Sequence, residues 1–411
     1  MSLEIKINAE RLWQSLEEMA AVGATEAGGN CRLALTSEDK AGRDLFCQWA
    51  REAGCDVTVD EVGNLFVHRA GTNASQAPVM TGSHLDTQPT GGRYDGVYGV
   101  LAGLEVLRAL NDHGVTTNRP VEVVVWSNEE GSRFQPGMTG SGVFCGEFSR
   151  DTVYATCDEQ GISYLEALDA IGARGAPPAK PRDIHTYIEA HIEQGPVLEA
   201  EEKTIGVVTG IQGIKWFKAR VVGVNAHAGT TPMEVRRDPL VAAGRMVDQI
   251  SQITKKLRPD AVATVGMFTA LPGSVNVINQ EVRFSIDLRC PDESALNDLG
   301  NQLQAECLQI AYDTGVQLEL EEIWNVPPTV FPESAVSVVE TATNELGLSN
   351  RRIVSGAGHD AKYLANISPT AMIFVPCKDG ISHNEAESIL PEHAAAGAEV
   401  LLQSILKLAN Q

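Results

Sequence analysis

Apolar and polar positions follow helical and strand periods in turn through the first half of the chain. SEDKAGRDLFCQWAREAG places Leu45, Phe46 and Trp49 on a helical period and stops at Gly54, which predicts a helix. CDVTVDEVGNLFVHR alternates like two paired strands. VMTGS, VEVVVWSN and IHTYIEA are apolar runs typical of strands buried on both faces, and DGVYGVLAGLEVLRALND carries one apolar helical stripe. This alternation predicts an α/β fold with a mostly parallel sheet and flanking helices.

The pattern changes near residue 210. A strand (IKWFKARVVGV), a helix (DPLVAAGRMVDQISQITKKL), a hairpin (AVATVGMFTAL and SVNVINQEVRFSIDLR), a second helix (SALNDLGNQLQAECLQIAYDTG) and a last strand (VQLELEEIW) follow one another. This β-α-β-β-α-β order is typical of a small antiparallel sheet with two helices on one face. The α/β pattern then returns with RRIVSG, TAMIFVP and a closing helix. We therefore predict a discontinuous α/β domain of residues 1–209 and 329–411 and an inserted α+β domain of residues 210–328.

Composition narrows the class of protein but does not identify it. The 411 residues are 43% hydrophobic, which gives ample material for two cored domains. No window approaches the ~20 continuous apolar residues of a membrane span. The formal net charge of −22 disfavours binding to nucleic acid or to anionic lipid. The eight cysteines are scattered without a C-x-x-C pair, so we expect reduced thiols and a cytoplasmic protein.

Ligand-type side chains follow four of the predicted strands. In open α/β sheets, ligands bind beyond the carboxyl ends of the strands. VMTGS is followed by His84, Asp86 and Asp95, VEVVVWSN by Glu129 and Glu130, IHTYIEA by His191, and TAMIFVP, after a short loop, by His383. Histidine and carboxylate are the ligands that borderline divalent metals prefer.

Each of these features also has an ordinary interpretation. A single histidine at a strand end is usually structural, and paired glutamates also occur at residues 17–18, 201–202 and 321–322, where we expect solvated surfaces. VEVVVWSN, however, is the most apolar strand of the chain, and two carboxylates directly at its end need a partner. The combination favours a metal site over a surface loop.

Five segments carry a resemblance to a known family. TGSHLDTQPTGGRYDG, SNEEGSRF, EAHIEQG, NAHAGTTPM and ISHNEAE closely resemble the M20 dinuclear metallopeptidase-like amidohydrolases, in order and over nearly the whole chain. The most similar branch contains N-carbamoyl-L-amino-acid hydrolases, β-ureidopropionases and allantoate amidohydrolases. The resemblance implies a metal-binding catalytic domain interrupted by a lid and dimerisation domain, and a homodimer that forms through the inserted domain.

The resemblance also implies roles for individual residues. His84 and His191 would bind one cation, Glu130 and His383 the other, and Asp95 would bridge the two. Glu129 corresponds to the general base, and Asp86 to the carboxylate that orients the imidazole of His84. The two cations per subunit would be zinc, with manganese, cobalt and nickel as alternatives. On the inserted domain, His227 resembles a histidine that stabilises transition-state charge, in cis or from the partner subunit. The residues that resemble substrate contacts are Gln194, His227, Asn276, Arg289 and Gly358.

The implied reaction is hydrolysis of the carbamoyl C–N bond of an N-carbamoyl-L-amino acid, which gives the L-amino acid, CO2 and ammonia. Catalysis would require closure about hinges near residues 208–212 and 326–330. Allantoate and β-ureidopropionate remain alternative substrates, and an M20 aminoacylase or dipeptidase is a more distant alternative. A catalytically inactive binding protein is disfavoured because Glu129 accompanies every ligand position. His359 and Asp360 lie in a matching motif, SGAGHD, without an assigned role.

Overall fold

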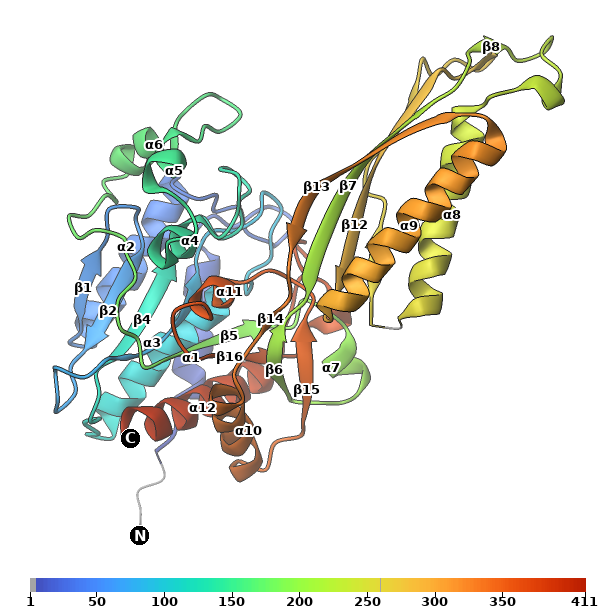
Figure 1. The fold of residues 1–411 in the computed structure, drawn as a ribbon. Helices are drawn as coiled ribbons and strands as arrows, with labels where there is room; N and C mark the ends of the chain where they lie inside the picture. The colour runs from blue at the N-terminus through green and yellow to red at the C-terminus, as the bar shows by residue number, and fades with distance from the viewer. Residues whose placement is uncertain (1–4, 259) are drawn as a thin grey trace. The chain divides into compact units, whose positions relative to one another are not determined.

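The computed structural model describes residues 5–258 and 260–411 and divides into two compact units (Figure 1). Unit 1 comprises Met1–Thr209 and Val330–Gln411, and unit 2 comprises Gly210–Thr329. The chain therefore leaves the first unit once and returns to it once. The domain boundaries predicted from the sequence lie between residues 209 and 210 and between residues 328 and 329. No helix in the described part of the chain is long and apolar enough to cross a membrane.

Unit 1 is built on a nine-stranded sheet. Its strands run in the order β1-β2-β4-β3-β5-β16-β6-β14, and β15 also pairs with β6. The four central strands, β4, β3, β5 and β16, are parallel, whereas β2 and β6 join them antiparallel at either side. This arrangement confirms the predicted α/β class with a mostly parallel sheet. The strands are β1 (Asp56–Val59), β2 (Leu65–Arg69), β3 (Val79–His84), β4 (Val121–Trp126), β5 (Thr186–Ile192), β6 (Ile205–Ile211), β14 (Thr329–Val330), β15 (Asn350–Ser355) and β16 (Thr370–Val375).

Helices α1, α3, α10 and α12 form a packed layer against this sheet. α3 contacts β3 and β5, α12 contacts β16, and α1 and α12 both pack on α3. α2 packs on β1, whereas α4 and α11 contact each other and the strands β4, β5 and β16. The helices of unit 1 are α1 (Ala9–Ala20), α2 (Ser37–Glu52), α3 (Val97–Asp112), α4 (Thr139–Cys145), α5 (Arg150–Ala155), α6 (Tyr164–Ala170), α7 (Val197–Ala200), α10 (Glu333–Glu345), α11 (Ala361–Leu364) and α12 (Pro391–Ala409), with a short 3-10 turn η2 (Lys378–Gly380).

Unit 2 has the predicted β-α-β-β-α-β order. Its sheet runs β10-β12-β7-β13, with β9 also paired to β12, and α8 and α9 pack on each other and on the sheet. Alternate residues of β7 are buried, because only one face of the sheet carries helices. The elements are β7 (Gly213–Val222), β8 (Ala226–His227), η1 (Met233–Val235), α8 (Pro239–Leu257), β9 (Val262–Thr264), β10 (Phe268–Leu271), β11 (Val277–Ile278), β12 (Glu281–Cys290), α9 (Glu293–Thr314) and β13 (Gln317–Val326).

The strands of the predicted hairpin are each broken in two. AVATVGMFTAL forms β9 and β10, and SVNVINQEVRFSIDLR forms β11 and β12. β11 pairs with β8, whereas β12 pairs with β7, β9 and β10, so neighbouring parts of one apolar run enter different ladders. Apolar alternation alone does not show this change of partner. β6 was missing from the sequence prediction, because IGVVTGI contains two glycines within a short run.

Candidate functional site

Four parallel strands of unit 1 deliver ligand-type side chains to one edge of the sheet. His84 is the last residue of β3, and His191 is the penultimate residue of β5. Glu130 follows the end of β4, and His383 lies in the segment after β16. Asp95 lies in the loop between β3 and α3. Because the carboxyl ends of β4, β3, β5 and β16 meet at the same edge, residues far apart in sequence become neighbours here.

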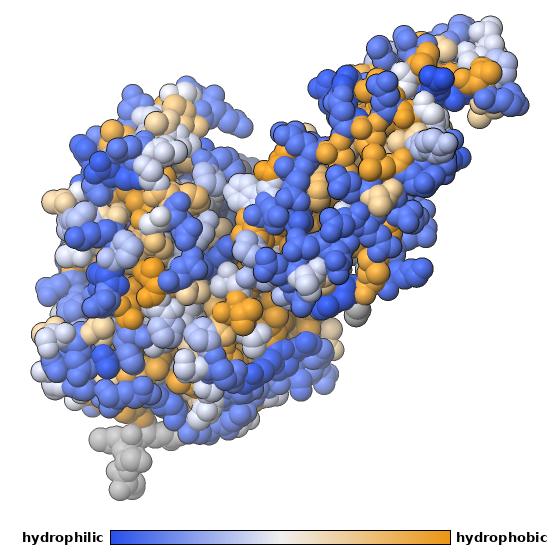
Figure 2. Space-filling view, in the orientation of Figure 1, coloured by the Kyte–Doolittle hydropathy of each residue, from blue (hydrophilic) through white to orange (hydrophobic). Residues whose placement is uncertain are grey.

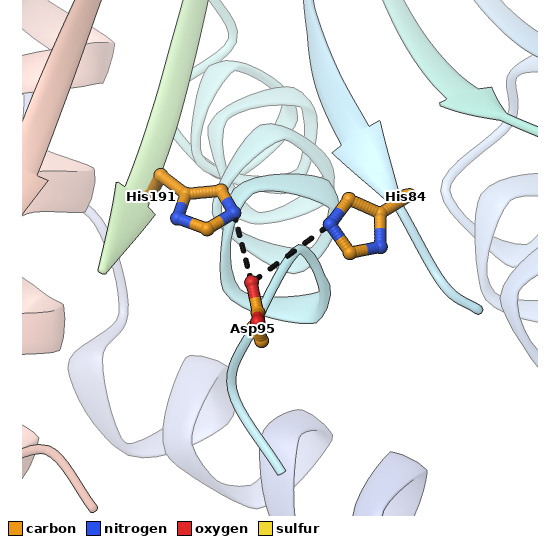
Figure 3. A group of neighbouring side chains, drawn as sticks. All are labelled: His84, Asp95 and His191. Carbon is orange, nitrogen blue, oxygen red and sulfur yellow. Dashed lines mark ion pairs between the residues drawn. The ribbon is translucent and has the colours of Figure 1, made fainter. Parts of the chain in front are cut away.

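His84, Asp95 and His191 form the first group, and all three side chains are buried (Figure 3). The Nε2 atom of His191 lies 3.1 Å from Asp95 Oδ1, and the Nε2 atom of His84 lies 3.9 Å from the same oxygen. Gly96 makes room for this arrangement. Its φ is +67°, and a Cβ at this position would lie 2.3 Å from the imidazole of His84. A larger residue would therefore be strained and would displace the ring.

Asp95, Glu130 and His383 form the second group. The Nε2 atom of His383 lies 3.2 Å from Asp95 Oδ2 and 3.3 Å from Glu130 Oε2. Gln88 Nε2 donates to Glu130 Oε2 at 2.7 Å and so holds this carboxylate. The two oxygens of Asp95 thus face different ligand groups, Oδ1 the first and Oδ2 the second. This is the arrangement that a bridging carboxylate requires.

Backbone carbonyl oxygens orient the two imidazoles of the first group. Nδ1 of His84 lies 2.9 Å from the carbonyl oxygen of Asp86, and Nδ1 of His191 lies 2.9 Å from that of Ile192. A carbonyl oxygen can only accept, so Nδ1 of each ring carries the proton that it donates, and Nε2 is left facing Asp95.

The carboxylate of Asp86 makes different contacts from those expected. Its Oδ1 lies 3.9 Å from Nδ1 of His84, beyond hydrogen-bond distance. Instead, Oδ1 and Oδ2 accept the backbone N–H groups of Glu129 and Glu130, each at 3.2 Å. Asp86 therefore orients His84 through its main chain and holds the turn after β4 through its side chain.

Several buried acids of the site favour their protonated form. Burial, with Asp360 and Glu130 nearby, raises the pKa of Glu129 well above its ordinary value. Burial and the charge of Asp95 raise the pKa of Glu130 to about 8. Burial and Asp39 raise the pKa of Asp86 to about 7. Acids that crowd one another in this way lack compensating positive charge.

Asp95 and the histidines show the opposite pattern. Burial would raise the pKa of Asp95, but hydrogen bonds with His191 and His383 hold it well below its ordinary value. Burial would likewise lower the pKa of His191, but its hydrogen bond with Asp95 raises this pKa to about 9. His383 forms its own hydrogen bond with Asp95, which raises the pKa of His383 to about 9. Burial lowers the pKa of His84 to about 4, so this imidazole is neutral.

This donor set fits two divalent cations. Each group combines histidine nitrogens with carboxylate oxygens and shares Asp95, and all the donor atoms of a group lie within 4.8 Å of one another. The raised pKa values of His191 and His383 favour positive charge where bound cations would supply it. The surplus of buried acids is consistent with a site built around additional positive charge.

The backbone is strained at three of the strand ends that form the site. Asn128, Gln194 and His383 all have positive φ, of 54°, 57° and 53°. Asn128 precedes Glu129, and Gln194 donates from Nε2 to Asp95 Oδ2 at 2.9 Å. Residues other than glycine adopt such conformations mainly where the surrounding structure imposes them, often at functional sites.

The remaining predicted residues lie in two places. Gly358 precedes His359, whose ring lies 4.5 Å from that of His191. His227, Asn276 and Arg289 belong to unit 2. His227 pairs with Val277 across β8 and β11, and the backbone N–H of Ala228 donates to the carbonyl of Asn276. Arg289 lies near the far end of β12 and pairs with Asp287 at 2.9 Å.

Sequence reasoning missed Gln88, Ser382 and Glu387. Ser382 Oγ lies 3.2 Å from Asp95 Oδ2 and 3.0 Å from Glu387 Oε2. All three residues lie inside segments already singled out, TGSHLDTQPTGGRYDG and ISHNEAE. The one feature that could have indicated Glu387 is its position four residues after His383. In a polar segment, however, the sequence does not distinguish a buried glutamate from a solvated one.

Comparisons with known proteins agree over the full length of the chain. The sequence model described as Peptidase family M20/M25/M40 matches residues 80–407. The N-carbamoyl-L-amino-acid amidohydrolase of Rhizobium meliloti is 45% identical over 98% of this chain and 97% of its own, and the allantoate amidohydrolase of Escherichia coli K12 is 35% identical over 97% and 98%. The crystal structure of an amidase of the hydantoinase/carbamoylase family from Burkholderia multivorans superposes with a TM-score of 0.96 at 52% identity, covering 99% of both chains.

Proposed function

The chain belongs to peptidase family M20/M25/M40, and from this premise we propose that it is a metal-dependent N-carbamoyl-L-amino-acid amidohydrolase. The reaction is hydrolysis of the carbamoyl C–N bond, which yields the L-amino acid, CO2 and ammonia. The observation that carries this proposal is the position of Asp95 between two ligand groups, in a chain that matches a carbamoyl-cleaving relative end to end.

Five side chains would hold two divalent cations. His84 and His191 would bind one, Glu130 and His383 the other, and Asp95 both. When bound, such a pair of cations lowers the pKa of a shared water and polarises a carbonyl oxygen. We propose zinc, with manganese, cobalt and nickel as alternatives, because histidine and carboxylate donors suit all four.

Glu129 would move the proton in this reaction. Its Oε2 lies 3.5 Å from Nε2 of His84, at the edge of the first ligand group, and its side chain is buried. Burial and neighbouring acids raise its pKa well above the ordinary value, so it readily holds a proton once it has taken one. It would accept the proton of the attacking water and return it to the departing nitrogen.

Substrate recognition would use residues of both units. The guanidinium of Arg289 matches the two oxygens of an α-carboxylate. Asn276, whose carbonyl accepts from the backbone N–H of Ala228 beside His227, would supply amide donors. Gln194 would turn from Asp95 to the substrate once cations occupy the site. Gly358 would contribute its backbone. His227 would stabilise the charge that develops on the carbonyl oxygen.

The geometry of unit 2 supports a contribution of His227 from a partner subunit. In the ladder between β12 and β7, Arg289 lies opposite Ile214 at one end, and Glu281 lies opposite Val222 at the other. His227 follows β7 and lies beyond the end that carries Val222. Eight residues of strand separate Glu281 from Arg289, which is about 26 Å. An N-carbamoyl amino acid is roughly 7 Å long, about two extended residues. One copy of unit 2 therefore cannot place His227 and Arg289 on the same substrate.

We accordingly propose a homodimer that forms through unit 2. Most of the large apolar side chains exposed in the described part of the chain belong to unit 2, among them Met233, Val235, Met267 and Phe268. Figure 2 shows apolar residues distributed along this unit between hydrophilic ones. The concentration of exposed apolar side chains on unit 2 supports an interface there. The eight free cysteines favour a cytoplasmic location.

Release of ammonia from the ureido substrates, and of free amino acids from the dipeptide, tests the proposed function. Metal-free protein is incubated with zinc, manganese, cobalt or nickel and then with N-carbamoyl-L-methionine, N-carbamoyl-β-alanine, allantoate or a dipeptide. We expect the N-carbamoyl-L-amino acid to be hydrolysed fastest. Allantoate is the second candidate, since an amidohydrolase of that name is among the relatives. Release from allantoate alone would replace the proposed substrate, and cleavage of the dipeptide alone would refute carbamoyl hydrolysis.

A further inference from the structure

Glu387 has a buried carboxylate that the proposed reaction does not use. It lies four residues after His383, and only 1% of the residue is exposed. Its Oε1 accepts the backbone N–H groups of Tyr94, at 2.9 Å, and Asp95, at 3.1 Å. Its Oε2 lies 3.0 Å from the hydroxyl of Ser382, the residue before His383. The carboxylate thus joins the segment that carries Asp95 to the segment that carries His383.

The chain provides a fitted space for this carboxylate at Gly92. A Cβ at position 92 would lie 2.0 Å from the carboxyl carbon of Glu387 and 2.1 Å from its Oε1. The φ of Gly92 lies outside the left-handed region, so the backbone conformation there is open to other residues. A side chain at this position would therefore have to displace the carboxylate. Two positions about 300 residues apart are thus matched to each other.

The matched pair lies directly behind the second ligand group. Asp95 and His383 belong to segments that meet only in the folded protein, and a cation held by Asp95, Glu130 and His383 requires them at a fixed separation. Ser382 strengthens the link, because its hydroxyl contacts both Glu387 Oε2 and Asp95 Oδ2. Groups behind metal ligands commonly set affinity in this way.

We propose that Glu387 is a positioning residue that fixes Asp95 relative to His383 and so sets the affinity of the second ligand group for its cation. The inference rests on the proposed function, since it takes these residues as metal ligands. Glu387 acts through geometry, by accepting hydrogen bonds, and not through its charge. A glutamine at this position can still accept from both backbone N–H groups and face the Ser382 hydroxyl with its amide nitrogen.

The proposal is tested by titrating the metal-free protein with cobalt(II) and measuring binding by calorimetry and by visible absorption. The wild-type protein should bind two ions. Glu387→Leu, similar in size but without acceptors, should weaken one of the two by about 10- to 100-fold and the other by less, because Asp95 also faces the first ligand group. Gly92→Ala should weaken the same ion by roughly tenfold, because the new methyl group displaces the carboxylate. Glu387→Gln should bind both ions close to wild type.

Asp60→Leu is the matched control. Asp60 is also a buried carboxylate of unit 1, and it accepts the backbone N–H groups of Val62 and Asn64 and the side-chain amide of Asn64. None of these partners is a proposed ligand. Asp60→Leu and Glu387→Leu should both lower the thermal unfolding midpoint of the metal-free protein. In Asp60→Leu, however, both cobalt affinities should stay at the wild-type value.

Three outcomes with the variants would overturn the inference. The first is wild-type affinity for both ions in Glu387→Leu and Gly92→Ala, and the second is equal weakening in Asp60→Leu. The third is a glutamine variant as weak as the leucine variant, which would show that charge is what matters. A wild-type protein that binds two ions but releases no ammonia from any ureido acid would refute the proposed function alone, and fewer than two ions would refute the inference.

Discussion

Glu129 and Glu130 are adjacent in the sequence, yet their side chains meet different partners. Oε2 of Glu129 lies near His84, whereas Oε2 of Glu130 lies near His383 and Gln88. The carboxylate of Asp86 holds both backbone N–H groups and so fixes the turn from which the two side chains diverge. Glu129 is thereby left outside both ligand groups, as its proposed role in proton transfer requires, while Glu130 belongs to the second group.

This division of roles predicts the behaviour of Glu129→Gln. The amide has nearly the same shape but cannot take a proton from water, so kcat should fall by about 10²- to 10⁴-fold. The metal content should stay at the wild-type value, because the ligand groups do not include Glu129. Steady-state kinetics and elemental analysis measure the two effects. Near-normal turnover would exclude Glu129 as the base.

The sequence could predict which residues gather at the site but not how they hold one another. Strand ends of a parallel sheet converge by topology, so His84, Glu130 and His191 could be placed together from the pattern alone. The hydrogen bonds of Asp86 and the burial of Glu387 depend on loop conformations with positive φ, at Asn128 and elsewhere. Such loops are set by tertiary contacts, which no local pattern encodes.

At the scale of the element, α3 departs from its predicted character. The sequence predicts one apolar stripe, but nearly every residue of the helix is buried, because β3 and β5 cover one side and α1 and α12 another. Glu105 is fully buried within this contact. It accepts from Arg11 Nε at 2.8 Å, from Arg11 Nη2 at 2.7 Å and from the backbone N–H of Asn8 at 2.8 Å.

Glu105→Leu should therefore destabilise the fold without affecting catalysis. The substitution removes three hydrogen bonds, two of them from a guanidinium, but Arg11 keeps Asp112 and is partly exposed to water. We expect a loss of about 2 kcal/mol in the free energy of unfolding. Urea denaturation measures the loss, and kcat should remain at the wild-type value. Asp112→Asn, at an exposed position, is the control and should change stability by less than about 0.5 kcal/mol. An equal loss in both variants would contradict this account.

At the scale of the whole molecule, the buried titratable groups of the site make the stability of the metal-free protein depend on pH. The pKa of Glu130 is raised from 4.5 to about 8, so the folded state retains a proton that the unfolded state releases, and stability falls as the pH rises toward 8. The pKa values of His191 and His383 are raised from 6.5 to about 9, and their contribution, complete below 6.5, is lost as the pH rises through 9. His84, with a pKa lowered to about 4, acts in the opposite direction only below 6.5.

The metal-free protein should accordingly become less stable between pH 6.5 and pH 8, by more than about 1 kcal/mol. Added zinc should reverse the loss most strongly at pH 8, because the ligands must be deprotonated to bind it. Thermal unfolding midpoints across this range, with and without zinc, measure both effects. If the unfolding midpoint rises with pH in the absence of metal, Glu130, His191 and His383 do not have the raised pKa values given above.

The separation of His227 from Arg289 within unit 2 predicts complementation between inactive subunits. In a mixture of His227→Ala and Glu129→Gln proteins, a mixed dimer has one site with an intact Glu129 and an intact His227 from the other subunit. Random exchange should restore roughly a quarter of wild-type activity. Each variant alone should remain nearly inactive. No recovery after verified subunit exchange would show that His227 acts on its own subunit's site.

The position of β16 in the sheet constrains the order in which the polypeptide can mature on the ribosome. β16 lies between β5 and β6, yet it is the last strand to be synthesised, after the whole of unit 2. Until residue 375 has emerged, β5 and β6 lack the strand that joins them, and His383 is still to come. Unit 2 has its own core and can fold during this interval. A nascent chain can therefore complete unit 2 before it can complete the second ligand group of unit 1.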